Sequence, residues 1–227
     1  MCNISNTLNH MGNREALLLG AKQCLLEKGY ARTTARDIAS AAKVSLAAIG
    51  YHFSSKEALL TEALLLAIGD WDNELREALT PDILVGADPI ERFEATWTRL
   101  IQTFETHRPL WAANFELFAQ MDRLPEIRHV LGDSLQNARI GLAALFLNQE
   151  VGSIDEQTAR TVGAFYHALL SGLLAQFLIN PEQALSAHDL TAAMRTISRK
   201  VFLHQPSIPP KRSRMLKNPT RTPGRTL

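Results

Sequence analysis

The 227-residue sequence predicts an all-α protein, in which a small N-terminal domain of three helices precedes a longer helical bundle. Three observations support this prediction. Hydroxyl side chains stand at Thr34, Ser45 and Ser54, where short helices would begin. Apolar residues recur at helical spacing along the rest of the chain, without the alternation typical of strands. Prolines open three of the later helices, at a position where the missing N–H costs nothing.

Two short helices are expected near the N-terminus. The first spans 35–42 and begins with a capping box formed by Thr34 and Asp37. The chain then turns tightly at 43–44, and the second helix covers 46–52 with Ser45 as its cap. Two short helices joined by such a turn have the geometry of a helix-turn-helix, whose second helix fits the major groove of DNA. An ordinary helical hairpin would show the same spacing.

Longer helices are expected on both sides of this pair. The one before it spans 13–28 and ends at Gly29, which favours a left-handed C-terminal conformation. The one after it spans 55–79, and Ser54 with Glu57 three residues later predicts a second capping box. The first would back the two short helices, and the second would connect them mechanically to the rest of the chain.

The stretch 16–65 resembles the N-terminal DNA-binding domain of the TetR family of bacterial transcriptional regulators. The segments that carry the resemblance are Gly29-Tyr30, Thr33-Thr34, Arg36-Asp37-Ile38-Ala39, Val44-Ser45, and Tyr51-His52-Phe53 running into Ser55-Lys56-Glu57-Ala58-Leu59-Leu60. The family usually has glycine at the turn, where this chain has Lys43. A left-handed non-glycine residue costs on the order of 1 kcal/mol, which a contact between the lysine and a phosphate would offset.

The resemblance implies a sequence-specific DNA-binding regulator, most simply a cytoplasmic, homodimeric repressor that a small-molecule ligand releases from a palindromic operator. No cofactor, metal or enzymatic activity is expected. The residues expected at the DNA are Thr33, Thr34, Arg36, Lys43, Ser45, Leu46, Ala47, Ala48, Tyr51, His52 and Lys56. His52 could instead be a packed surface residue, and Tyr51 could belong to the core.

The second helix offers few side-chain hydrogen bonds to bases. Leu46, Ala47, Ala48 and Gly50 have none to give. We therefore expect sequence recognition through thymine methyl groups, Tyr51 and DNA shape, and not through arginine–guanine pairs.

Five further helices are predicted after a break at 81–89. They span 89–106, 109–122, 125–147, 155–180 and 190–202. Aromatic and amide side chains on them would line a ligand pocket, although each could also be plain core packing. These residues are Trp97, Phe104, Trp111, Asn114, Phe118, Asn137, Tyr166 and His167. Because the segments show no cluster of buried charge, the expected effector is neutral or apolar.

The run 161–180 contains no Asp, Glu, Lys or Arg and is long enough to cross a membrane. Polar residues and glycines dilute it, so we expect no membrane span but a helix covered on most sides. The family resemblance points to a four-helix dimer interface built from this helix and the last one. The residues expected in that interface are Ala164, Ala168, Ser171, Leu174, Leu178, Leu190, Met194, Ile197 and Val201.

The net charge of +1 is unevenly distributed. Residues 1–60 carry +3, residues 206–227 carry +6, and the remainder carries −8, as expected of a protein that meets DNA at one end. The predicted domains are a disordered leader (1–12), a helix-turn-helix domain (13–54), an effector-binding and dimerisation domain (55–205) and a disordered basic tail (206–227). The tail would add salt-sensitive DNA affinity or serve only solubility.

Two other classes of function are an enzyme and a regulator that needs no ligand. A di-iron enzyme needs two Glu-x-x-His motifs, and the chain has one, Glu126 to His129. It also lacks a G-x-S-x-G motif, a phosphate-binding glycine loop and zinc-site spacing, and its two cysteines suit a reducing cytoplasm. A DNA-binding or protein-interacting regulator that needs no ligand remains the alternative.

Overall fold

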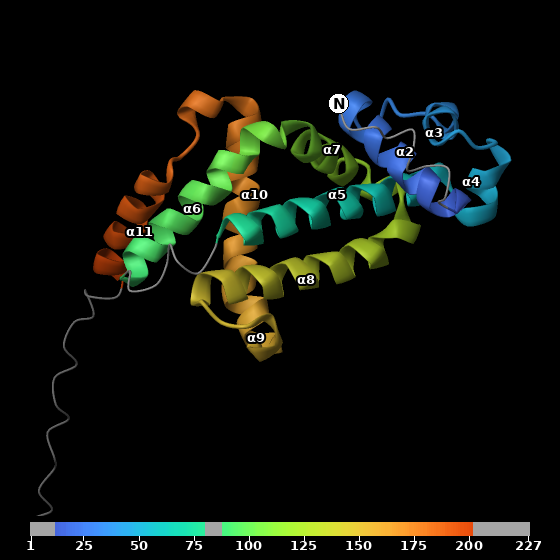
Figure 1. Ribbon diagram of the computed structural model, residues 1–227. Coiled ribbons are helices and arrows are strands. Elements are labelled where there is room, and N and C mark those ends of the chain that lie inside the picture. The colour runs from blue at the N-terminus through green and yellow to red at the C-terminus, as the bar shows by residue number, and fades with distance from the viewer. Residues whose placement is uncertain (1–11, 80–87, 202–227) are drawn as a thin grey trace, which may run out of the picture. The chain divides into compact units, whose positions relative to one another are not determined.

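The computed structural model describes residues 12–79 and 88–201 (Figure 1). Every regular element in these two ranges is helical, which confirms the all-α prediction. The helices are α2 (Asn13–Lys28), α3 (Ala35–Ala42), α4 (Ala47–His52), α5 (Lys56–Ala78), α6 (Pro89–Thr106), α7 (Arg108–Phe118), α8 (Arg128–Leu147), α9 (Glu156–Thr158), α10 (Ala164–Ile179) and α11 (Ala187–Val201). The predicted leader, apart from Gly12, and the predicted tail lie outside the described residues, as does most of the break at 81–89.

Several helices begin and end at the residues that the sequence predicts. The helices α2, α3 and α6 have the predicted bounds, and α6 begins with Pro89 after an Asp88–Glu91 capping box. The predicted helix 109–122 instead ends at Phe118 and gives way to a 3-10 turn. Pro125 lies just beyond, and the residue before a proline disfavours the helical conformation.

The predicted helix 155–180 is interrupted by a π turn at Ala159–Gly163. A Cβ atom built on Gly163 would lie 2.2 Å from the carbonyl oxygen of Arg139, so the backbones of α8 and of this turn are in direct contact. Glycine is required at this crossing because any side chain would collide with backbone that has no room to move. Figure 1 shows α10 crossing α8 just beyond this turn.

The helices α2 and α3 and the start of α5 pack around one small core. Leu17 and Leu25 of α2, Ile38 of α3 and Leu59 of α5 are fully buried. Gly20 allows α2 and α3 to approach closely, since a Cβ there would lie 2.9 Å from the backbone nitrogen of Ala42. The helix α4 completes this group, which we call the head.

The core continues from the head along α5 into the helices that follow. Trp71 of α5, Trp97 and Phe104 of α6 and Leu117 of α7 are all buried. The chain divides into two compact units after Thr191. Within the first unit, α11 begins with the buried residues 187, 190 and 191. The described part of the second unit is the rest of α11, where every residue except Met194 is exposed.

Candidate nucleic-acid interface

The start of α3 has the capping box that the sequence predicts. The Asp37 N–H donates to Thr34 Oγ1 over 3.2 Å, and the Thr34 N–H donates to Asp37 Oδ2 over 2.9 Å. Two N–H groups that a helix start leaves without partners are thereby satisfied. The N-terminus of this helix also favours a nearby negative charge, such as a DNA phosphate.

Asp37 also joins α3 to α2. The ammonium of Lys28 lies 2.5 Å from Asp37 Oδ1, and the Thr34 hydroxyl donates to Asp37 Oδ2 over 2.6 Å. These hydrogen bonds, that from Lys28 first, hold the pKa of Asp37 well below its usual range, and the same contact raises the pKa of Lys28. The carboxylate is therefore ionised and paired, and it orients the helix-turn-helix.

Thr33 lies inside the head and not on its surface. Only 1% of the residue is exposed, and its hydroxyl donates to the carbonyl oxygens of Gly29, over 2.7 Å, and Cys24, over 3.1 Å. The Thr33 side chain therefore closes the turn between α2 and α3 and, contrary to expectation, is not placed to meet DNA.

The turn after α3 adopts the conformation that usually calls for glycine. Lys43 has φ 55° and ψ 37°, in the left-handed region. Its N–H donates to Ser40 O over 3.2 Å, and the Val44 N–H donates to Ala39 O over 3.1 Å. This pair of bonds is a Schellman motif, which satisfies carbonyl groups at the end of a helix.

The start of α4 differs from the prediction. Ser45 was expected to cap the helix, but the helix begins at Ala47 without a side-chain cap. The Ala48 N–H instead donates to the backbone oxygen of Ser45 over 3.0 Å, and Ala48 is half-buried. The Ser45 side chain is therefore left exposed at the surface.

One face of α4 is uncovered and mostly apolar. Leu46 is 48% exposed, Ala47 is exposed, and Tyr51 is 85% exposed, whereas Ile49 on the other face is buried. The high exposure of Tyr51 excludes the alternative that it belongs to the core. Its ring meets the edge of the half-buried His52 ring at 4.8 Å, which positions both aromatic side chains at the end of the helix.

The cap of α5 lies one residue later than predicted. The hydroxyl of Ser55, and not that of Ser54, accepts from the Ala58 N–H over 3.0 Å. The expected box between Ser54 and Glu57 is consequently absent. Two adjacent serines are equally good candidates for a helix cap in the sequence. The path of the chain out of α4 decides which of them caps α5.

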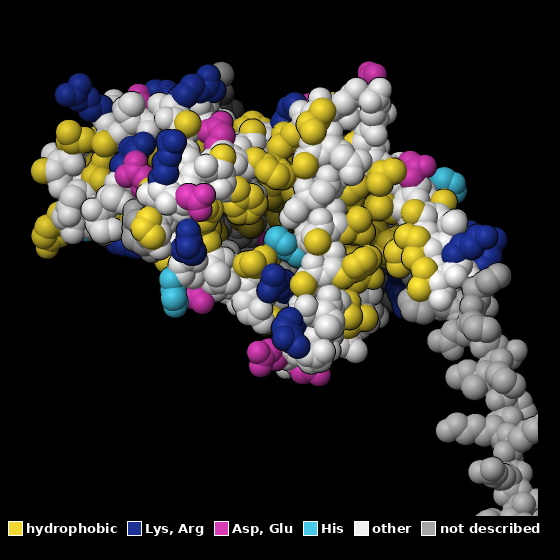
Figure 2. Space-filling view, turned by 180° about the vertical axis from the view of Figure 1, so that it is seen from behind, with side chains coloured by type: hydrophobic (Ala, Val, Ile, Leu, Met, Phe, Trp, Pro, Cys, Tyr) yellow, Lys and Arg dark blue, Asp and Glu magenta, His cyan; other side chains and the backbone are white. Residues whose placement is uncertain are grey.

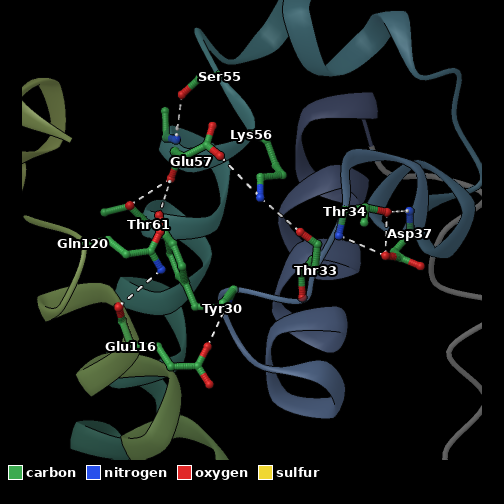
Figure 3. Close-up of polar contacts among 12 residues, drawn as sticks. Tyr30, Thr33, Thr34, Asp37, Ser55, Lys56, Glu57, Thr61, Glu116 and Gln120 are labelled. Atoms are coloured by element: carbon green, nitrogen blue, oxygen red, sulfur yellow. Dashed lines mark hydrogen bonds and ion pairs between the residues drawn. The ribbon is translucent and has the colours of Figure 1, made fainter. Parts of the chain in front are cut away.

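Lys56 faces the α2–α3 turn instead of the solvent. Its ammonium donates to the Thr33 carbonyl oxygen over 3.1 Å and lies 3.3 Å from Glu57 Oε1 (Figure 3). Arg36 and Lys43 are exposed, and neither makes an ion pair with any described residue. Figure 2 shows Lys and Arg side chains distributed over the head, with hydrophobic side chains at its edge.

A contact from α7 ties the head to the rest of the first unit. The Ala31 N–H donates to Glu116 Oε2 over 2.8 Å, and Gln120 Nε2 donates to the Glu116 carbonyl oxygen over 3.3 Å (Figure 3). Gly29 has φ 83°, and a Cβ there would lie 2.9 Å from Glu116 Oε1. Gly29 ends α2 with a positive φ, but its ψ of 169° lies outside the left-handed conformation that was predicted. The absence of a side chain at Gly29 makes room for this carboxylate.

The residues expected to line a ligand pocket separate into small groups. Trp97 and Tyr166 are connected through the rings of Phe93 and Phe146, which are not among the eight predicted residues. Phe104 instead contacts Phe177, and Trp111 contacts Trp71. Asn114 and His167 are half-buried, whereas Phe118 and Asn137 are exposed. Of the eight predicted residues, only Trp97 and Tyr166 therefore belong to one group of contacting rings.

Two of the residues expected at a dimer interface are core residues of this chain. Leu174 and Leu190 are buried, while Ala164, Ser171, Leu178 and Met194 are half-buried. Ala168, Ile197 and Val201 are exposed. The uncovered stripe of α10 is rotated by about one position from the predicted one. It consists of Phe165, Ala168, Gly172, Gln176 and Ile179.

Comparisons with protein-family models and with solved structures show which known proteins this chain resembles. The model described as bacterial regulatory proteins of the tetR family matches residues 17–63, and the tetracyclin repressor-like C-terminal domain matches residues 88–200. The structure is similar to a transcriptional regulator from Rhodococcus sp. Rha1, with 21% identity and a TM-score of 0.56 over 82% of this chain and 96% of that one.

A second similar structure is the multidrug binding protein EbrR complexed with proflavin. It shows 20% identity and a TM-score of 0.59 over 82% of this chain and 99% of that one. No curated protein matches the sequence. Solved structures at this level of sequence identity show only that the fold is shared. The two family models together match more than half of the chain and show the family. The chain therefore belongs to the TetR family of bacterial transcriptional regulators, which are DNA-binding proteins and not enzymes.

Proposed function

We propose that the protein is a cytoplasmic homodimeric repressor that binds a palindromic operator through two copies of α4 and leaves it when a small molecule binds. Residues 13–54 would form the DNA-binding domain and residues 55–205 the effector-binding and dimerisation domain. The observation that supports this most directly is the uncovered face of α4, which α2 and α3 support from behind. Glu116 of α7 is bonded to Ala31 in the turn between α2 and α3.

The contacts with DNA would divide between phosphates and bases. Arg36 and Lys43 are the exposed cations beside α4, and Thr34 stands at a helix start that favours a phosphate. Leu46, Ala47 and Tyr51 would enter the major groove, where apolar side chains meet thymine methyl groups. Thr33 and Lys56 would act indirectly, by holding the α2–α3 turn in place.

The uncovered stripe of α10 supports a homodimer. The run Glu156–Ile179 is long and apolar enough to cross a membrane, yet only 28% of its most apolar window is buried. TetR-family regulators are soluble DNA-binding proteins, and one such helix does not make a membrane protein. Phe165 and Ile179 flank the small residues Ala168 and Gly172, which allow a second helix to approach closely. A second copy covering this face would place two heads at neighbouring half-sites.

The ligand would bind among the aromatic side chains of α6, α8 and α10. Trp97 is fully buried, and its indole N–H has no hydrogen-bond partner among the described residues. Buried polar groups normally have partners, so this N–H is available to a ligand. EbrR, which has a similar fold, was solved in complex with proflavin. Movement of α7 would then reach the head through the Glu116–Ala31 bond.

The test begins with selection of genomic DNA fragments bound by the purified full-length protein. A palindrome with half-sites about one helical turn apart is expected. Fluorescence anisotropy with that duplex then measures release by candidate metabolites, and analytical ultracentrifugation measures the oligomeric state. A monomer, or a chain that binds no duplex at modest salt, contradicts the proposal. DNA binding without release by any metabolite would favour the ligand-independent regulator instead.

A further inference from the structure

Arg139 occupies an unusual position on α8. Leu135, Arg139, Leu142 and Phe146 are spaced by four, three and four residues, so they lie on one face of the helix. Leu142 is buried, and Arg139 itself is half-buried. A long cationic side chain on the apolar face of a helix usually brings its charged end to water or to an ionic partner, because removing a charge from water is costly.

That partner is missing from the part of the chain that the structure describes. The Nε atom of Arg139 is buried and has no hydrogen-bond partner, and no ion pair joins the guanidinium to a described carboxylate. The facing helix offers none, because 161–180 contains no acidic residue. The guanidinium therefore carries a positive charge that no described carboxylate pairs with, and its Nε atom is buried without a hydrogen-bond partner.

Aromatic rings stand two turns farther along the same face. The Phe146 ring stacks on the Tyr166 ring with centroids 3.9 Å apart and an angle of 9°, and Trp97 lies 5.1 Å from Phe146. Phe93 closes the group, 6.4 Å from Tyr166. We call these four rings the aromatic wall.

His167 lies within the field of Arg139. Burial, and then the positive charge of Arg139, lower the pKa of His167. The imidazole is therefore neutral at physiological pH and can accept or donate a hydrogen bond without adding a second positive charge. The region consequently combines one unmatched cation, one neutral polar ring and an apolar wall.

We propose that the effector is an aromatic carboxylic acid, whose carboxylate pairs with Arg139 while its ring system packs against the aromatic wall. This rests on the proposed ligand-responsive function and revises the expectation of a neutral effector. A planar carboxylate matches the guanidinium fork, which can donate two parallel hydrogen bonds. Because Arg139 and Phe146 are separated by about 10 Å along the helix axis, a bicyclic acid suits the site better than benzoate.

The test compares 2-naphthoate with the uncharged 2-naphthamide by isothermal titration calorimetry on the full-length protein. Naphthoate should bind about tenfold or more tightly than naphthamide, as expected for a charge-assisted pair. The substitution R139Q should remove this preference, and R139K should retain part of it. R128Q is the matched control, because Arg128 lies on the same helix but is exposed and faces Asp122 at 3.8 Å. It should behave like the wild type.

The proposal is overturned if the two compounds bind equally to the wild type, if neither binds, or if R139Q keeps the preference for naphthoate. The wild-type comparison does not depend on whether R139Q folds, which circular dichroism checks separately. Release of DNA is measured in parallel by anisotropy. If naphthoate binds through Arg139 without releasing DNA, the site binds an aromatic acid that is not the effector, and this inference fails. If another metabolite releases DNA and naphthoate does not bind, only this inference fails.

Discussion

Replacement of Lys43 by glycine tests the turn and the DNA contact in one variant. Lys43 has a left-handed backbone, which costs an L-residue about 1–2 kcal/mol. Glycine removes that strain but loses about 0.5–1 kcal/mol more backbone entropy on folding. The net expectation is a stabilisation of about 0.5–1 kcal/mol, which corresponds to a rise of roughly 2 °C in Tm for a chain of this size.

The same substitution should weaken DNA binding. If the exposed Lys43 ammonium neutralises one phosphate per subunit, its removal lowers the slope of log affinity against log salt by about 0.9 per contact. Thermal unfolding followed by circular dichroism measures the first effect, and fluorescence anisotropy between 50 and 200 mM salt, roughly the range where such contacts matter, measures the second.

Lys43→Asn is the matched control, since asparagine tolerates the left-handed conformation and carries no charge. It should show the altered salt dependence with little change in Tm. A glycine variant that melts below the wild type would refute the argument from backbone strain. An unchanged salt slope in both variants would show that Lys43 does not contact a phosphate.

Further predictions concern the head and its link to α7. Thr33→Val removes a buried hydroxyl and leaves two carbonyl oxygens without that donor. The free energy of unfolding, measured by urea denaturation, should therefore fall by about 1–3 kcal/mol. An unchanged denaturation midpoint would argue against a structural role for Thr33. Asp37→Asn should destabilise the head at neutral pH. Because folding lowers the pKa of Asp37, its contribution to stability is present above the unfolded pKa of 3.8 and is lost as the pH falls below that value toward the folded pKa. The difference in Tm between the variant and the wild type should therefore disappear in melts at acid pH. A difference in Tm that does not depend on pH would contradict this. Glu116→Gln keeps the shape of the link but removes its charge, and it should weaken ligand-induced release of DNA more than DNA binding itself; equal loss of both would assign Glu116 to stability alone. Replacing single thymines of the operator by uracil should lower affinity at one position or more, and no loss anywhere would rule out recognition through thymine methyl groups.

Several features of the chain follow from its sequence because they depend on neighbours along the chain. Thr34 and Asp37 are three residues apart and cap α3 wherever that helix lies. The left-handed turn at Lys43 follows from two helices that must be joined by three or four residues. Pro89 opens α6 because its missing N–H would have no partner there. The TetR-like head was predictable for the same reason, as its motifs are contiguous.

Other features depended on which segments meet in space. The sequence could not tell that Thr33 is buried or that Lys56 turns toward the Thr33 carbonyl, because both depend on how α5 packs behind the α2–α3 turn. The outward face of α10 was misjudged because a helix that is apolar on all sides has no period to read, and its neighbours alone decide what is covered.

Arg139 shows the division most clearly. Its place among Leu135, Leu142 and Phe146 is visible in the sequence as a charge on an apolar face. The sequence does not show whether the charge of Arg139 is paired, because a lysine or arginine on such a face usually reaches solvent with its charged end. The structure adds that its Nε atom is buried without a hydrogen-bond partner and that no described carboxylate forms an ion pair with its guanidinium. Local chemistry along the chain determined the helices and their caps, and the packing of distant helices determined which side chains remain available to DNA or a ligand.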